Sequence, residues 1–175
     1  MDFNLLIGGA AGQGMETLSA TLSKILQKRG YHLFTLQDYM SRVRGGHNFF
    51  QIRFSENLVK THRDDLDGII ALNSETIDLH LKRLHENGFI IADEDVPHHD
   101  PRLITIPAKR LAKEVGNPKV QSSAILGALL KIYGMDLTFV EEIFSYKFDD
   151  KVVQQNMEAF KKGYELTESR FVEPE

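Results

Sequence analysis

The sequence predicts an α/β fold with a doubly wound, mostly parallel sheet, helices on both faces and a helical C-terminal part. Short apolar runs typical of buried strands alternate along the chain with segments whose apolar residues recur at helical spacing. Residues 3–36 also follow the order strand, glycine turn, helix and strand, which is a βαβ unit. We expect one domain over residues 1–164, with 165–175 as a polar tail or severed linker.

The βαβ unit begins with an apolar run at Phe3–Ile7 that ends at a group of glycines. Beyond them, apolar side chains from Met15 to Leu26 fall on one face of a helix, and Gly30 is a stop signal at its C-terminus. Tyr31–Leu36 then reads as the second strand.

The pattern of Asn48–Ser55 differs, because aromatic or aliphatic side chains alternate with polar ones, as in a half-exposed strand. With a turn at Glu56-Asn57, this segment can form an antiparallel hairpin with Leu58–His62 at the edge of the sheet. Further strands are expected at Gly68–Leu72, Phe89–Ala92 and Leu103–Ile106. Helices are expected from Ser74 to Asn87-Gly88 and, beyond Pro107, at 108–115, 122–133, 136–146 and 150–163.

Composition excludes several classes of function. The 175 residues include no cysteine, which removes disulfides, thiolate zinc sites, cysteine-ligated iron–sulfur clusters and a cysteine nucleophile. The formal net charge of −4 gives no electrostatic reason to expect nucleic acid or an anionic membrane as a partner. The N-terminal apolar run is too short for a signal peptide or a membrane span, so we expect a cytoplasmic protein.

The first candidate binding segment follows the first strand and begins a helix, where ligands bind in open α/β sheets. It contains Gly8, Gly9, Gly12, Gln13 and Gly14. Closely spaced glycines and the free N–H groups of a helix N-terminus favour a phosphate or pyrophosphate, although small residues can also serve a tight turn by packing alone. The spacing matches neither the dinucleotide fingerprint nor the Walker A motif.

The second candidate segment contains Arg42, Arg44, Gly45, Gly46 and His47. Two guanidiniums beside paired glycines suit recognition of a carboxylate, a phosphate or an acidic partner surface. The alternative is a solvated loop whose arginines pair with local acids.

A catalytic set and a metal site are not evident in the sequence. The adjacent side chains of His98-His99-Asp100 project in different directions, and no nucleophile–base pair occurs. The sequence therefore favours a chain that binds or assembles over one that turns over substrate alone.

Together, the two segments resemble the gamma subunit, or gamma domain, of the 2-oxoacid:ferredoxin oxidoreductases, which are the pyruvate and 2-oxoglutarate synthases. The resemblance extends through 49–55, Ile106-Pro107-Ala108, Leu126-Gly127-Ala128 and Asn156 to Gly163-Tyr164. The Ser-Arg-x-Arg-Gly-Gly-His-Asn form is closest to the N-terminal domain of fused alpha subunits. One departure is Ser122, where the family usually has asparagine, and this places any hydrogen bond of that asparagine in doubt.

The resemblance implies a non-catalytic component of an enzyme that oxidatively decarboxylates a 2-oxoacid to an acyl-CoA. That enzyme acts on an oxo donor, and we expect this chain alone to be inactive. It implies thiamine diphosphate and an iron–sulfur cluster in partner alpha and beta subunits, with ferredoxin contacted indirectly. The resemblance implies coenzyme A as the ligand of this chain. A homodimer of the chain is a further possible assembly. Two alternatives stay open: a stand-alone nucleotide-binding oxidoreductase or regulatory module, and a purely structural assembly domain.

Overall fold

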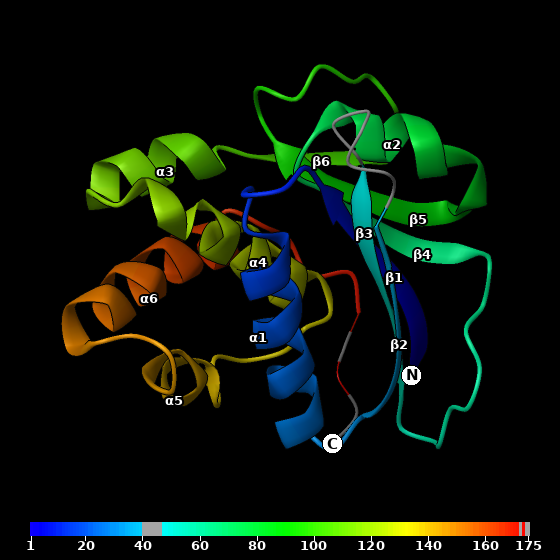
Figure 1. Cartoon of the computed structure of the whole chain (residues 1–175), viewed down its shortest axis with the longest axis horizontal. Coiled ribbons are helices and arrows are strands. Elements are labelled where there is room, and N and C mark those ends of the chain that lie inside the picture. The colour runs from blue at the N-terminus through cyan, green and yellow to red at the C-terminus, as the bar shows by residue number, and fades with distance from the viewer. Residues whose placement is uncertain (40–46, 172, 174–175) are drawn as a thin grey trace.

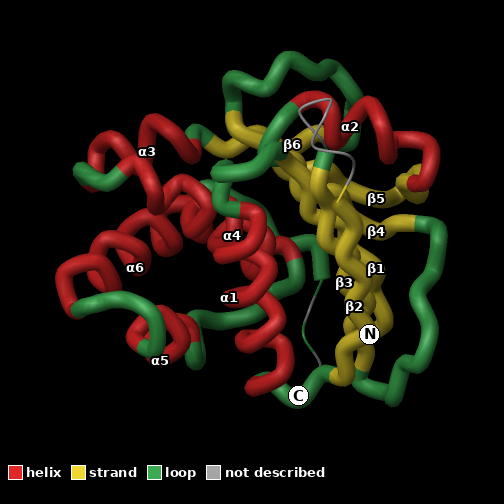
Figure 2. Tube along the Cα trace, viewed as in Figure 1, coloured by secondary structure: helices red, strands yellow, loops and turns green. Residues whose placement is uncertain are grey.

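The computed structural model describes residues 1–39, 47–171 and 173, and it has the predicted α/β architecture (Figures 1 and 2). Six strands form one sheet in the order β2-β3-β1-β4-β5-β6. The strands are β1 (Asp2–Gly9), β2 (His32–Tyr39), β3 (Asn48–Ser55), β4 (Leu66–Ala71), β5 (Leu84–Asp93) and β6 (Leu103–Ile106). The α-helices are α1 (Met15–Lys28), α2 (Ser74–His80), α3 (Ala108–Val115), α4 (Gln121–Ile132), α5 (Val140–Ser145) and α6 (Asp150–Glu165).

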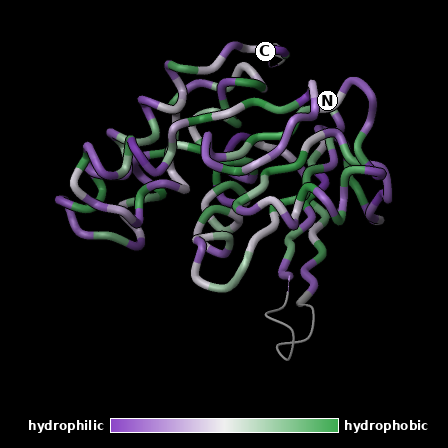
Figure 3. Tube along the Cα trace, turned by 90° about the horizontal axis from the view of Figure 1, so that it is seen from above, coloured by the Kyte–Doolittle hydropathy of each residue, from purple (hydrophilic) through white to green (hydrophobic). Residues whose placement is uncertain are grey.

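Helices cover both faces of the sheet, but unequally (Figure 1). One face packs against α1 and α4, and α3, α5 and α6 lie outside them. This side holds the larger core, to which β1 contributes Leu5 and Ile7. The opposite face, beneath α2, holds a smaller core around Leu6 and Ile77, because successive residues of a strand point to opposite faces. Figure 3 shows hydrophobic segments running through the middle of the molecule and hydrophilic ones along its outer turns.

The predicted edge hairpin is wrong. β3 lies inside the sheet and pairs antiparallel with both β1 and β2, while residues 58–62 form no strand. The polar face of β3 is covered by the loop of residues 56–65: the Gln51 side chain donates to the carbonyl oxygen of Arg63 at 2.7 Å, and Arg53 donates to that of Thr61 at 3.1 Å. Alternation indicated the two faces correctly, but a hydrogen-bonding loop can cover a polar face as well as water can.

The second helix is shorter than predicted. α2 ends at His80 and a 3₁₀ turn, Leu81–Arg83, leads directly into β5. Leu84 is buried and pairs with Leu66 in a parallel register that shifts before Gly68, so the segment expected to complete the helix instead extends a strand. α5 likewise begins at Val140, four residues later than the helix expected from 136.

The residues after α6, which the sequence predicted to be a polar tail or severed linker, pack against the core at least through Phe171. The backbone N–H groups of Arg170 and Phe171 both donate to the carbonyl oxygen of Ile132, at 2.9 and 3.0 Å. The Phe171 ring lies 4.8 Å from that of Phe3 and 5.4 Å from that of Tyr133, between centroids. The domain boundary at residue 164 stays a prediction. Among the described helices, none is long and apolar enough to cross a membrane.

Candidate functional site

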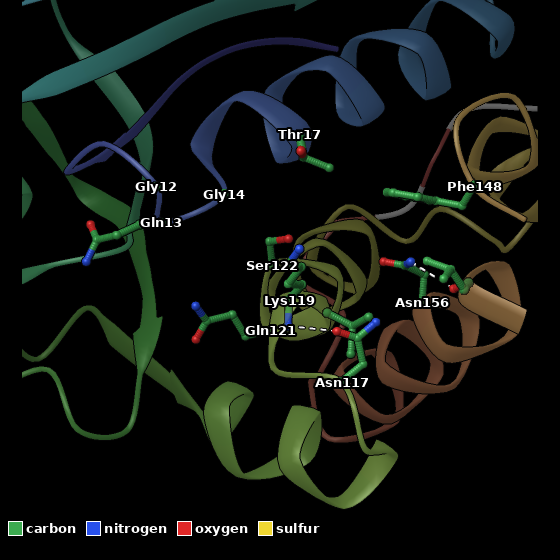
Figure 4. A pocket seen from close by; sticks show the side chains of 12 residues that line it. Gly12, Gln13, Gly14, Thr17, Asn117, Lys119, Gln121, Ser122, Phe148 and Asn156 are labelled. Atoms are coloured by element: carbon green, nitrogen blue, oxygen red, sulfur yellow. Dashed lines mark hydrogen bonds between the residues drawn. The ribbon is translucent and has the colours of Figure 1, made fainter.

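A cavity of about 550 Å³ lies where three segments distant in the sequence meet (Figure 4). The first is the glycine turn between β1 and α1, the second is the segment that leads into α4, and the third comprises the end of the α5–α6 connection and the first turns of α6. The lining residues are Gly12, Gln13, Gly14, Thr17, Asn117, Lys119, Val120, Gln121, Ser122, Phe148, Val152 and Asn156. A cavity of this volume is within the range of small-molecule sites.

The glycine turn is stabilised by the side chain of one of its own residues, Gln13. The Gln13 Oε1 atom accepts a hydrogen bond from the backbone N–H of Ala10 at 2.6 Å. Gly12 and Gly14 have φ values of +83° and +89°, a region that residues with a Cβ rarely adopt. Gly14 is the N-cap of α1 and, lacking a side chain, leaves the first N–H groups of the helix uncapped.

A second helix begins at the same cavity. The 3₁₀ turn Pro118–Val120 leads directly into α4, and the N-cap of this turn is Asn117, whose side-chain oxygen accepts a hydrogen bond from the backbone N–H of Lys119 at 3.1 Å. Ser122, in the first turn of α4, is buried, and its Oγ would lie 3.5 Å from a Cβ added at Gly14. The uncapped N-terminus of α1 and the Asn117-capped turn that begins α4 therefore converge on one cavity, and the partial positive charge of a helix N-terminus favours an anion there.

Hydrogen bonds hold Asn156 and Thr17 of the cavity lining. Ser123 Oγ donates to Asn156 Oδ1 at 2.6 Å, and Asn156 Nδ2 donates to the carbonyl oxygen of Val152 at 2.9 Å. At the rim, Lys147 Nζ donates to Thr17 Oγ1 at 3.1 Å and so joins the α5–α6 connection to α1. Lys119, exposed at the start of α4, adds a second cation, and the cavity suits the phosphate end of a ligand.

The structure places the predicted residues in two groups. Gly12, Gln13 and Gly14 line the cavity. Gly8 and Gly9 lie behind it: a Cβ on Gly8 would lie 2.5 Å from Thr76 Cγ2, and one on Gly9 would lie 2.9 Å from Leu72 Cβ. These two glycines therefore allow α2 and its connection to approach β1. Arg42, Arg44, Gly45 and Gly46 lie outside the described residues.

His47 is also away from the cavity, buried on the α2 side of the sheet. Its Nε2 atom lies 3.0 Å from Nε2 of His80, and both rings contact that of Phe49. Burial lowers the pKa of His47, and burial together with the neighbouring His47 and Arg83 lowers the pKa of His80 to about 4. Both imidazoles are therefore neutral at pH 7, with one ring donating and the other accepting.

Sequence reasoning had not assigned a site role to the start of α4 or to the α5–α6 connection. The break at Gly116-Asn117-Pro118 was the available signal, because a helix that starts after such a break exposes its N-terminus. Phe148 and Val152 carried no local signal at all. Among the described residues, no group of three or more histidine, aspartate or glutamate side chains could hold a metal ion.

Comparison with known proteins gives consistent matches. The family model for pyruvate ferredoxin/flavodoxin oxidoreductase matches residues 4–166. The alpha subunit of 2-oxoacid:ferredoxin oxidoreductase 2 from Aeropyrum pernix is 22% identical over 100% of this chain and 35% of its own length. The chain thus spans about a third of the curated relatives it first matches.

Two solved structures share the fold. One is 2-oxoglutarate:ferredoxin oxidoreductase from Magnetococcus marinus, solved with 2-oxoglutarate, coenzyme A and succinyl-CoA bound, with a TM-score of 0.86 and 21% identity over 99% of this chain and 33% of that one. The other is the gamma subunit of a keto/oxoacid ferredoxin oxidoreductase from Geobacter sulfurreducens, with a TM-score of 0.80 and 23% identity over 94% of this chain and 95% of that one.

Proposed function

The chain belongs to the pyruvate ferredoxin/flavodoxin oxidoreductase family, as its two loops indicated, and we propose that it is the non-catalytic gamma component of such an enzyme. The reaction is the oxidative decarboxylation of a 2-oxoacid to an acyl-CoA, with electrons passed to ferredoxin. The match to a gamma subunit over nearly its whole length supports this role. Because iron–sulfur clusters are held by cysteine and this chain has none, the cluster belongs to a partner, as does thiamine diphosphate.

The contribution of this chain is to bind part of coenzyme A in the cavity beside Gly14. One observation carries the assignment: the uncapped N-terminus of α1 meets the start of α4 at a cavity lined by Lys119 and by Thr17, whose Oγ1 atom accepts a hydrogen bond from Lys147. Coenzyme A presents phosphate groups to such a site, and helix N-termini and lysines both stabilise phosphate. The apolar side chains of Phe148 and Val152 offer contact area for the uncharged part of the ligand.

The binding assignment can be tested by calorimetric titration of coenzyme A into the full chain. Removing the charge of Lys119 with Lys119→Met should weaken binding about tenfold, the value of one charge-assisted contact. The control is Lys82→Met, an exposed lysine in the turn after α2 on the other face of the sheet. Equal dissociation constants for the wild type and Lys119→Met would refute the site.

The second loop has a separate test, since Arg44 lies outside the described residues. If its guanidinium meets coenzyme A or a partner subunit, Arg44→Ala weakens coenzyme A affinity or assembly in the reconstituted complex. Unchanged values for both would contradict this role.

The assignment as a component has its own experiment. The chain alone should show no oxidation of 2-oxoacids, and activity should return when alpha and beta subunits are added. Turnover by the isolated chain would overturn the proposal. Tighter binding of NAD, NADP or FAD than of coenzyme A would instead favour a stand-alone nucleotide-binding protein.

A further inference from the structure

The two edges of the sheet are built differently. At one edge, β6 is only four residues long and lies between Pro101 and Pro107, which limit its extension. At the other edge, β2 runs for eight residues and pairs with β3 in an uninterrupted register from His32 to Tyr39. Within the described parts of the chain, no strand pairs with the outer side of β2. β2 is therefore an edge strand of the described sheet.

β2 lacks the features that normally protect an edge strand. It contains no lysine, arginine or proline, and its register has no bulge. Thr35 and Leu36 are exposed, Leu36 by 39% of its surface, and Phe34 is only half-buried. Phe34 and Leu36 lie on the α2 face of the sheet, because they stand opposite Arg53 and Gln51 of β3. A partly apolar edge of this length, in which Asp38 is the one acidic residue, is a surface for strand addition.

We propose that β2 pairs antiparallel with β2 of a second copy of this chain, about a twofold axis that passes through Thr35. In this register each Phe34 stands opposite Leu36 of the other copy, so two apolar cross-strand pairs form on the α2 face. Each His32 stands opposite Asp38 of the other copy, so an imidazole faces a carboxylate at both ends. In this register the strand sets apolar side chains against apolar ones and polar side chains against polar ones, as a self-complementary twofold interface requires.

Neighbouring registers lose this complementarity. A shift of the axis by one residue places either Phe34 or Leu36 opposite its own copy. His32 then faces Leu36, or Asp38 faces Phe34, and no imidazole–carboxylate pair forms. Only the register centred on Thr35 pairs both apolar and both polar residues, and the match holds independently of the proposed function.

The first test is the mass of the full chain in solution by sedimentation equilibrium. We expect twice the 19.9 kDa of one chain. Leu36→Lys, which sets a charge against the apolar pair, should weaken dimerisation about tenfold or more. The matched control is Leu79→Lys, a leucine of α2 that is 49% exposed and lies away from the edge. Far-UV circular dichroism confirms that both variants are folded.

The second test examines the register through a charge exchange. His32→Asp places carboxylates opposite each other and should weaken the dimer, whereas His32→Asp combined with Asp38→His should restore it. A chain that is monomeric at its highest soluble concentration overturns the proposal. This outcome covers the case in which the β2 edge pairs with a strand of a different protein instead of a second copy. A dimer that is unaffected by Leu36→Lys also overturns it, and failure of the double variant to restore the dimer refutes the register.

Discussion

Replacing Gly163 with alanine tests the contact that holds the two central helices together. A Cβ added at Gly163 of α6 would overlap the carbonyl oxygen of Ala124 in α4 and lie 2.7 Å from the carbonyl carbon. Gly127 of α4 has the reciprocal clash with the backbone of Phe160. Because the overlapped oxygen must return to an ordinary contact distance, the helices must separate by about 1.5 Å to accept the methyl group.

The expected loss is a difference between two opposing effects. Overpacking a rigid backbone contact costs about 3 kcal/mol, whereas alanine is better than glycine inside a helix by about 1 kcal/mol. The net destabilisation is therefore about 2 kcal/mol. Separation of α4 and α6 also displaces Ser122 and Asn156, so coenzyme A should bind more weakly.

The assay is urea unfolding followed by far-UV circular dichroism, with Gly30→Ala as the comparison. Gly30 has a φ of +94° but open space around its added Cβ, so alanine there suffers only backbone strain of about 1 kcal/mol. A smaller loss of unfolding free energy for Gly163→Ala than for Gly30→Ala would refute the argument from helix packing.

Three further predictions concern the histidine pair, the sheet and the glycine turn. Since the pKa of His80 falls from 6.5 to about 4 on folding, the unfolded chain binds the extra proton between these values, and stability present above pH 6.5 decreases as the pH falls. Because solvent screens part of this shift, the decrease near pH 4 is about 1–2 kcal/mol. Urea midpoints measured across this range should decrease less steeply in His80→Leu, and equal slopes would contradict the assignment. Asn4→Ala should cost about 2 kcal/mol, because the fully buried Asn4 amide donates to two carbonyl oxygens of the 56–65 loop; a loss below about 0.5 kcal/mol in denaturant unfolding would argue against this role. Gly14→Ala should cost about 1 kcal/mol through its positive φ and weaken coenzyme A binding in the same titration as above, and unchanged affinity would remove Gly14 from the site.

Local patterns predicted most elements well. The apolar run at 3–7 lies within β1, Asn48–Ser55 matches β3, and Leu103–Ile106 matches β6. These segments are specified by side-chain periodicity, which is a property of neighbouring residues. The errors arose where two structures share one local pattern: Leu84 fits the face of a helix as well as a buried strand, and its pairing with Leu66 decided between them.

The candidate site was predictable only in part. The glycine turn indicated Gly12, Gln13 and Gly14, since positive φ and a helix N-terminus leave a sequence signal. The opposite wall comes from Ser122 and Asn156, more than one hundred residues later. Their approach to the turn depends on how α4 and α6 pack, which no pattern around either residue contains.

The sequence by itself determined the fold class, the family and the glycine turn, because alternation, helical spacing and glycine act over a few neighbouring residues. Only the tertiary structure decided that β3 enters the sheet between β1 and β2, that the 56–65 loop covers its polar face, and that β2 remains an edge. The reason is physical: a polar strand face can be satisfied by water or by a distant loop, and an edge is defined by the strands that do not reach it.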